Sequence, residues 1–110
     1  MKTVFVLNRD EMGSGDSALG RKILGTCLRK LTAFTGLEAV VMYNGGVRLA
    51  TKQSPVAVEL NALHENGVEL LACGTCVEHF GLGDDLIVDR VSNMDEILAT
   101  IRRADKVITL

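Results

Sequence analysis

The chain has 110 residues, of which 47% are hydrophobic and 24% are charged, and its formal net charge is −2. This length suits one domain over residues 1–110, and the composition excludes a disordered chain. The lack of a basic block excludes a nucleic-acid binder that works by phosphate neutralisation, and no apolar run reaches the roughly 20 residues that span a bilayer. The first apolar run is too short for a signal peptide, so we expect a cytoplasmic protein without nucleic-acid or membrane partners.

The first half of the chain alternates apolar runs with helical periodicity. A strand is expected at 3–7, and the helix after it has apolar positions that begin at Leu19 and recur at helical spacing. Asp16 is the expected N-cap of this helix, and Gly36 lies beyond its end. A second strand is expected at 38–43.

The second half continues the alternation. A helix is expected to begin at Ser54-Pro55 and to carry Val58 among its apolar positions. Ser92 is the expected start of the last helix, with Asp95 three residues later as in a capping box. One short helix and three strands complete the pattern, at 75–80 and at 68–72, 85–88 and 106–110.

The strands are apolar at consecutive positions, which indicates burial on both faces. Strands separated by helices form parallel sheets. We therefore expect an α/β fold, a three-layer α/β/α single domain with a mostly parallel five-stranded sheet. Ligands of such sheets bind beyond the carboxyl ends of the strands. Polar residues and glycines gather after these expected ends, at 8–15, 44–46, 73–76 and near Asn93.

Cys73 directly follows the third expected strand and precedes a helix. Backbone N–H groups and the helix dipole stabilise thiolates at such positions. We therefore interpret Cys73 as a nucleophile toward sulfane sulfur, a selenium species or a disulfide, at the expected switch region of the sheet. Gly74, with Thr75 beside it, lets a substrate approach the backbone amides. Cys76 lies one helical turn further on and is the candidate that resolves a persulfide or mixed disulfide.

Other interpretations of the cysteines stay open. Both can be structural, and a C-x-x-C pair also occurs in zinc sites, where Cys73, Cys76, His79 and His64 would be the ligands. Because a second C-x-x-C and a histidine pair are missing from the sequence, we expect no metal and no other cofactor. His79 is also a candidate proton donor beside the thiols. Cys27 lies on the apolar stripe of the first helix, where a cysteine acts as a small hydrophobe.

Two glycine-rich loops are candidate ligand-binding segments. Gly13 and Gly15 precede the first helix, where backbone amides cradle anions, although the segment has neither a Walker nor a dinucleotide-binding pattern. Asn44-Gly45-Gly46 forms either a tight turn or a close approach of the backbone to a bound anion. Arg48 pairs with such an anion or is simply solvated. For both loops a purely structural connection is the alternative.

These residues occur in an order that resembles a known family. The segments that carry the resemblance are Met12-Gly13-x-Gly15-Asp16 with Leu19-Gly20, Tyr43-Asn44-Gly45-Gly46-Val47, Gly67-Val68-Glu69, Cys73-Gly74-Thr75-Cys76 and Asn93-Met94. Over essentially its whole length the chain resembles the DsrE-like domain of YedF-type proteins, a sulfurtransferase-like group linked to selenium metabolism. That group is similar to the wider DsrE/DsrF/TusD superfamily.

The resemblance implies a parallel five-stranded α/β/α sheet and a homo-oligomer, either a trimer or a hexamer. It also implies that Cys73 carries persulfide sulfur and that the loop Asn44-Gly45-Gly46 lies beside it. YedF-type chains place a TusA-like domain with a Cys-Pro site ahead of this one, whereas the single proline here is Pro55. The resemblance therefore implies separate sulfur donor and acceptor proteins, among them a TusA-like partner.

Three functions remain in competition at this point. The first is a sulfur-relay, sulfurtransferase-like protein that carries a persulfide on Cys73 in sulfur or selenium metabolism and turns over only with partners. The second is a dithiol redox protein that forms a Cys73–Cys76 disulfide. The third is an oligomeric module that binds a small anion, without catalysis.

Overall fold

Four parallel strands form the sheet of the protein, whose computed structural model describes residues 1–110. The order across the sheet is β3-β2-β1-β4, and all three strand pairs are parallel. The α/β class and the parallel sheet expected from the apolar runs are confirmed. The strands are β1 (Thr3–Leu7), β2 (Leu37–Met42), β3 (Glu69–Ala72) and β4 (Lys106–Thr109).

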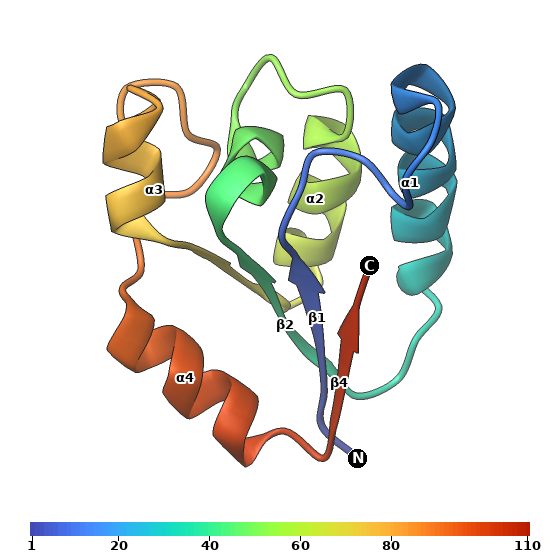
Figure 1. Ribbon diagram of the computed structural model, residues 1–110. Helices are drawn as coiled ribbons and strands as arrows, with labels where there is room; N and C mark the ends of the chain where they lie inside the picture. The colour runs from blue at the N-terminus through green and yellow to red at the C-terminus, as the bar shows by residue number, and fades with distance from the viewer.

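Helices cover both faces of the sheet. The helices that follow β1 and precede β3 lie on one face, and the last helix crosses the other face (Figure 1). A 3-10 helix and a short α-helix follow the carboxyl ends of β2 and β3 and lie next to each other. The helices are α1 (Ser17–Leu31), η1 (Asn44–Ala50), α2 (Ala57–Glu65), α3 (Gly74–His79) and α4 (Met94–Arg103).

Side-chain caps define where α1 and α4 begin. The carboxylate of Asp16 accepts the backbone N–H of Leu19 at 2.8 Å, so the expected N-cap is confirmed. The N-cap of α4 is Asn93 rather than Ser92, because the Asn93 amide oxygen accepts the N–H of Glu96 at 2.8 Å. Val58 of α2 is 78% exposed and is not part of the buried face.

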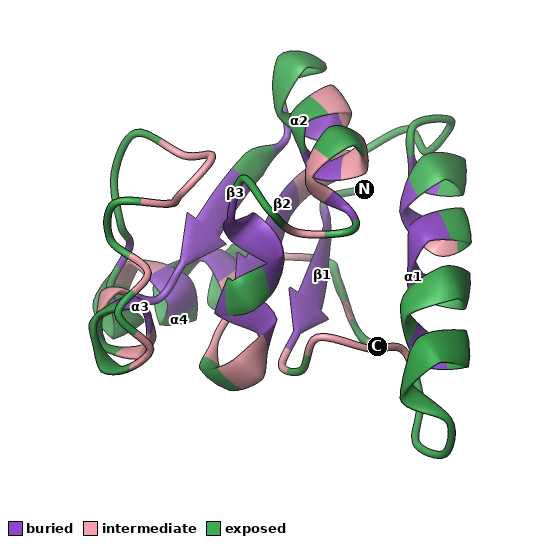
Figure 2. Ribbon diagram, turned by 90° about the horizontal axis from the view of Figure 1, so that it is seen from above, coloured by how far each residue is buried: buried purple, intermediate pink, exposed green.

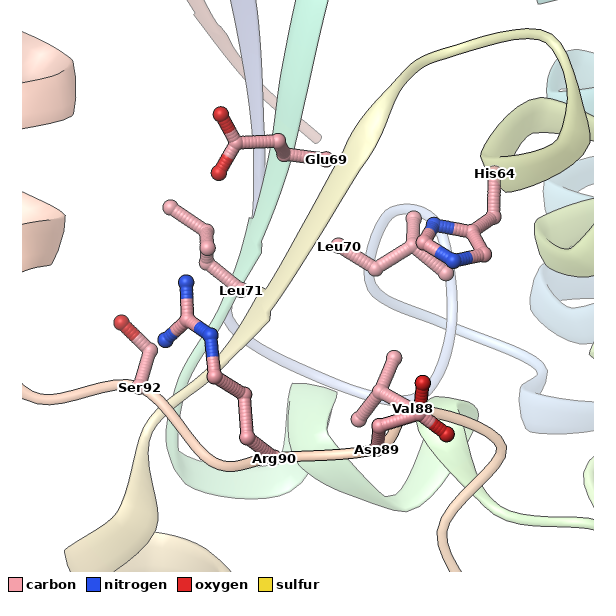
Figure 3. A pocket seen from close by; sticks show the side chains of 8 residues that line it. All are labelled: His64, Glu69, Leu70, Leu71, Val88, Asp89, Arg90 and Ser92. Carbon is pink, nitrogen blue, oxygen red and sulfur yellow. The ribbon is translucent and has the colours of Figure 1, made fainter.

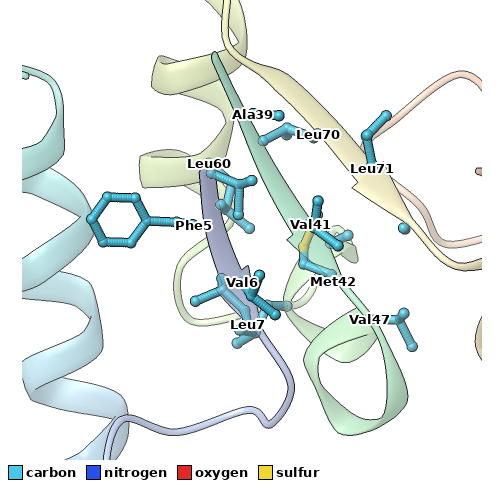
Figure 4. Packing of buried hydrophobic residues seen from close by; sticks show 14 of the residues in the cluster. Phe5, Val6, Leu7, Ala39, Val41, Met42, Val47, Leu60, Leu70 and Leu71 are labelled. Atoms are coloured by element: carbon cyan, nitrogen blue, oxygen red, sulfur yellow. The ribbon is translucent and has the colours of Figure 1, made fainter. Parts of the chain in front are cut away.

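The hydrophobic core lies around the two central strands. The burial colouring in Figure 2 marks β1 and most of β2 as buried, and a cluster of 24 buried hydrophobic residues surrounds them. In Figure 4 Phe5 points from β1 toward α1, where its ring meets Phe34 edge-on with centroids 6.0 Å apart. The edge strand β4 is mostly exposed, so the two central strands bury far more of their side chains than it does.

The expectation of five strands is wrong, because residues 85–88 form no strand. Leu86 makes one isolated antiparallel bridge to Thr51, at the end of η1. The backbone N–H of Ile87 donates to Ala50 at 2.8 Å, so this segment is held by η1 instead of by an edge of the sheet. Farther along, Ser92 makes a single parallel bridge to Cys73. The open edge of β3 therefore receives one residue of this connection rather than a strand.

The order in which the chain adds strands to the sheet also reverses at a different place from the one expected. The chain steps outward from β1 to β2 to β3 and then returns to add β4 on the other side of β1. The topological switch point is therefore between β1 and β4. The Cys73-Gly74-Thr75-Cys76 segment instead follows β3, an edge strand. No helix in the structure has the length and apolar character that crossing a membrane requires.

Candidate functional site

Cys73 and Cys76 occupy very different environments although they are one helical turn apart. Cys73 is the N-cap residue of α3 and is only 4% exposed. Cys76 is half-buried, and both are free thiols. Since β3 is buried and runs straight into α3, the first cysteine stays in the core while the second turns toward the surface. The two thiols therefore differ in their access to solvent: Cys76 has some, and Cys73 has almost none.

The Cys76 thiol lies in a cavity between α3 and η1. The cavity has a volume of about 270 Å³ and receives side chains or backbone from both elements. The backbone N–H of Asn44 donates to the Cys76 sulfur, Sγ, at 3.1 Å. The structure thus brings the first residue of the Asn44-Gly45-Gly46 loop to the cysteine pair. The lining residues are Asn44, Thr75, Cys76, His79 and Phe80.

The backbone of Asn44 and Gly46 explains how this amide is held on the sulfur. Asn44 has a φ of 49°, a left-handed conformation that asparagine tolerates better than most residues. A Cβ atom at Gly46 would lie 1.9 Å from the carbonyl oxygen of Leu7. Glycine is therefore required there by the close approach of η1 to the end of β1. A close approach of this loop to a bound anion was one of the alternatives considered above. The close approach seen at Gly46 is to the backbone of Leu7.

Burial is the main cause that raises the pKa of the Cys76 thiol, and the adjacent Cys73 thiol raises it further. The N–H of Asn44 acts in the opposite direction, because a hydrogen bond to sulfur favours the thiolate. The net pKa is above the ordinary cysteine value. Cys76 is therefore a thiol at neutral pH, and its reactivity requires removal of its proton.

Gly74 does not offer its amide to a substrate. Its backbone N–H donates to the carbonyl oxygen of Ser92 at 2.9 Å. A Cβ atom at Gly74 would lie 3.0 Å from both that oxygen and the side chain of Val91. The missing side chain is therefore explained by the packing of the 91–92 segment against the start of α3. The amide that reaches a cysteine sulfur comes from η1.

An ion pair holds this 91–92 segment against the site. Two guanidinium nitrogens of Arg90 each donate to the Glu96 carboxylate at 2.9 Å, and the Ser92 hydroxyl donates to the same carboxylate at 2.5 Å. The hydrogen bonds from Arg90 and then Ser92 lower the pKa of Glu96 to about 2. Arg90 and Glu96 were not predicted, and Ser92 was expected only as the start of the last helix, although an arginine and a glutamate six residues apart around a helix start are a usable signal.

The glycines at the other predicted positions lie away from the thiols. Gly45 lines an open hollow of about 510 Å³ that shares Asn44 with the thiol cavity. Gly13 and Gly15 line neither of these cavities, and both have positive φ values in the loop before α1. The structure therefore gathers Asn44, Thr75 and Cys76 around one cavity, whose lining includes neither Gly13 nor Gly15. The hollow is lined by Asn8, Arg9, Asp10, Glu11, Tyr43, Asn44 and Gly45.

The histidines are also separated. His79 lines the thiol cavity, whereas His64 lines a different one, of about 280 Å³, at the open edge of β3 (Figure 3). No group of three or more His, Cys, Asp or Glu side chains is placed to hold a metal ion. The four zinc ligands considered above are therefore not assembled. Cys27 lies on α1, half-buried, and burial raises the pKa of its thiol.

Phe80 lines the thiol cavity but was not among the predicted site residues. It follows Cys76 by four residues, which places the two side chains on one side of the short helix. The guanidinium of Arg48 stacks over its ring at 4.3 Å from the centroid. The i, i+4 spacing was visible in the sequence, but the contact with Arg48 depends on the packing of η1 against α3.

Comparisons with known proteins agree with this architecture. The model of the DsrE/DsrF-like family matches residues 1–110. Among solved structures, MTH1491 of Methanobacterium thermoautotrophicum, a protein of unknown function, has a TM-score of 0.71 at 23% identity and covers 99% of this chain and 98% of its own. The ychN protein of E. coli has a TM-score of 0.71 at 19% identity and covers 100% of both chains.

A third solved structure belongs to BT1422 of Bacteroides thetaiotaomicron, a conserved protein of unknown function. Its TM-score is 0.68 at 15% identity, with coverage of 99% of this chain and 95% of that one. No curated protein matches the chain. At these identities the three structures establish the fold alone.

Proposed function

The chain belongs to the DsrE/DsrF-like family, and from this premise we propose that it is a sulfur-relay protein whose Cys73–Cys76 pair carries sulfane sulfur as a persulfide. One observation carries the proposal. The Cys76 thiol lines a cavity and accepts a backbone N–H there, while the Cys73 thiol is buried one helical turn earlier. A carrier needs this combination of an accessible sulfur and a protected surrounding.

The exposure of the two thiols favours Cys76 as the receiving residue, and Cys73 as its partner. In the proposed step the Cys76 thiolate attacks the outer sulfur of a donor persulfide. A bond forms between Cys76 Sγ and the transferred sulfur, the donor S–S bond breaks, and the electron pair leaves on the donor thiolate, which takes up a proton. Delivery repeats the step, with an acceptor thiolate attacking the outer sulfur and Cys76 as the leaving group.

The surroundings of Cys76 fit both steps. The N–H of Asn44 stabilises negative charge on the sulfur when Cys76 attacks and again when it leaves. His79 lines the same cavity and is the candidate that takes the thiol proton. Because the pKa of Cys76 is raised, loading accelerates as pH rises through and above neutrality.

We propose that separate donor and acceptor proteins, a TusA-like protein among them, exchange sulfur with this protein. We also propose that it acts in sulfur or selenium metabolism. We also propose a homo-oligomer, a trimer or hexamer. Exposed apolar side chains on α4 and β4 support a subunit interface, because Leu98 is 57% exposed and Val107 is 40% exposed. Sedimentation at micromolar protein concentration tests the oligomer, and a monomer would refute it.

A dithiol redox protein is the second candidate function. It is favoured by the contact between the thiols, since Cys73 is close enough to raise the pKa of Cys76. In that case a disulfide substrate oxidises the pair by thiol–disulfide exchange: the two cysteine sulfurs join, and the substrate takes up their two hydrogens and leaves as two thiols. The intact mass of the protein distinguishes this function from sulfur carriage, because a disulfide lowers the mass and a persulfide raises it.

The test is the intact mass of the protein after exposure to a persulfide donor, with Cys76→Ser, Cys73→Ser and Cys27→Ser as the variants. We expect a reducible gain of about one sulfur atom, which Cys76→Ser abolishes and the control Cys27→Ser leaves unchanged. A gain of sulfur that only Cys73→Ser abolishes would make Cys73 the residue that receives sulfur, as the family resemblance implies. A loss of two hydrogens that either Cys73→Ser or Cys76→Ser abolishes would identify the redox pair. A gain of sulfur that persists in both Cys73→Ser and Cys76→Ser would refute the carrier.

A further inference from the structure

Arg48 places an unpaired positive charge next to the thiol cavity. Its guanidinium lies 4.3 Å from the ring centroid of Phe80, which lines the cavity together with Cys76. The guanidinium has no ion pair and no hydrogen-bond partner. Five other arginines have at least one such partner: Arg9, Arg21, Arg29, Arg90 and Arg103. Arg48 is thus held in position by an aromatic ring while its N–H donors remain free.

The cavity itself carries no negative charge. Its lining offers an amide, a hydroxyl, a thiol, an imidazole and an aromatic ring, and no carboxylate. The neighbouring hollow is different, because Asp10 and Glu11 line it. An anion that enters the thiol cavity therefore meets hydrogen-bond donors and the Arg48 charge without a carboxylate to repel it.

The spacing fits a small molecule that reaches from the thiol to the guanidinium. Residues four apart on a helix have Cβ atoms about 6 Å apart, which applies to Cys76 and Phe80. The Arg48 guanidinium lies over the Phe80 ring, so the thiol and the guanidinium flank the same aromatic side chain. A molecule with a sulfane sulfur at one end and a negative group a few bonds away would reach from one to the other.

We propose that, besides a partner protein, a small anionic sulfane-sulfur compound serves as a sulfur donor of this site, with its negative group bound by Arg48. This rests on the proposed persulfide carrier and names its donor class: a low-molecular-weight persulfide with a carboxylate, or thiosulfate. Guanidinium binds carboxylate and sulfonate-like oxygens through paired N–H donors. Transfer from such a persulfide forms the Cys76 persulfide and releases the donor thiolate, and transfer from thiosulfate releases sulfite. Neither reaction needs an added oxidant or reductant.

The experiment compares two donors that differ in one charge, the persulfide of N-acetylcysteine and that of its methyl ester. Thiosulfate is the third donor. The rate of sulfur gain is followed by intact mass in the wild-type protein, Arg48→Gln, Arg48→Lys and Arg102→Gln. Arg102 is the matched control, because it also lacks an ion pair and lies on α4. Thermal unfolding of each variant verifies that it is folded.

We expect the wild-type protein to load from an anionic donor at least about fivefold faster than from the ester. Arg48→Gln abolishes this preference by slowing loading from the anionic donors, Arg48→Lys restores part of it, and Arg102→Gln retains it. The faster of the two anionic donors identifies the source.

Equal loading from acid and ester in the wild-type protein would overturn the proposal, and so would an effect of Arg102→Gln as large as that of Arg48→Gln. A persulfide that forms on Cys76 in either case leaves the sulfur-carrier function standing. Absence of loading from all three donors would instead count against the carrier itself.

Discussion

The contact between Gly46 and the end of β1 makes a strong prediction about stability. A Cβ atom at Gly46 would lie 1.9 Å from the Leu7 carbonyl oxygen, where ordinary contacts begin at 3.4 Å. A backbone carbonyl cannot rotate away as a side chain can. Gly46→Ala therefore forces η1 to move away from β1 by an ångström or more.

Two hydrogen bonds at this junction set the size of the effect. The N–H of Tyr43 donates to Leu7 at 3.3 Å, and the N–H of Gly46 donates to Tyr43 at 3.0 Å. Losing both costs about 2 kcal/mol, and overpacking a close contact costs about 1–3 kcal/mol more. We expect Gly46→Ala to lower the free energy of unfolding by about 3–5 kcal/mol, which is a large part of the stability of a typical small domain.

Gly45→Ala is the matched control, one residue earlier in the same loop. A Cβ atom there would lie 3.6 Å from Arg9 Cα, an ordinary contact, so we expect a change within about 0.5 kcal/mol. Urea unfolding followed by circular dichroism measures both variants, and the midpoint of Gly46→Ala should fall by about 2 M. If Gly46→Ala unfolds at the same urea concentration as Gly45→Ala, the packing explanation of Gly46 is refuted.

Three other predictions follow from burial and charge. Under native conditions iodoacetamide should label Cys76 at least about tenfold faster than Cys73, which is 4% exposed, and peptide mapping that shows equal labelling would contradict the assigned exposure. Leu60→Ala should cost about 2–5 kcal/mol of unfolding free energy because Leu60 is fully buried, whereas Val58→Ala on the exposed side of α2 should cost less than about 0.5 kcal/mol. The pKa of Glu96 falls from 4.5 to about 2 on folding, so its stabilising contribution is complete above pH 4.5 and is lost as the pH falls toward 2. With its side chain 33% exposed, solvent screening reduces that contribution to about 1 kcal/mol, and the stability difference between wild type and Glu96→Gln should therefore disappear near pH 2 in acid titrations.

Local sequence patterns were sufficient for most of the fold. The apolar runs predicted β1, β2, β3 and β4 to within one residue at every end. Asp16 was predicted as a cap because its carboxylate acts on an N–H three residues later, a contact that needs no other part of the chain. The position of Cys73 between a strand and a helix was readable for the same reason. Each of these features depends on residues only a few positions apart.

The fifth strand was mispredicted because pairing is not a local property. Residues 85–88 have strand-forming side chains, but their backbone bonds to the end of η1, more than 30 residues earlier. Whether a short apolar run joins a sheet depends on which edge it reaches. The sequence pattern carries no information about that choice.

For the candidate site, local sequence patterns were enough to identify the chemistry: two thiols one turn apart after a buried strand, and a polar glycine loop near them. Which thiol is accessible, which amide reaches it and which charge lies beside it depend on the packing of distant segments. The N–H on Cys76 comes from Asn44, 32 residues away in sequence, and the amide of Gly74 is taken by Ser92. Burial and hydrogen bonding arise from segments that meet only when the sheet assembles, so no pattern of neighbouring residues could assign them.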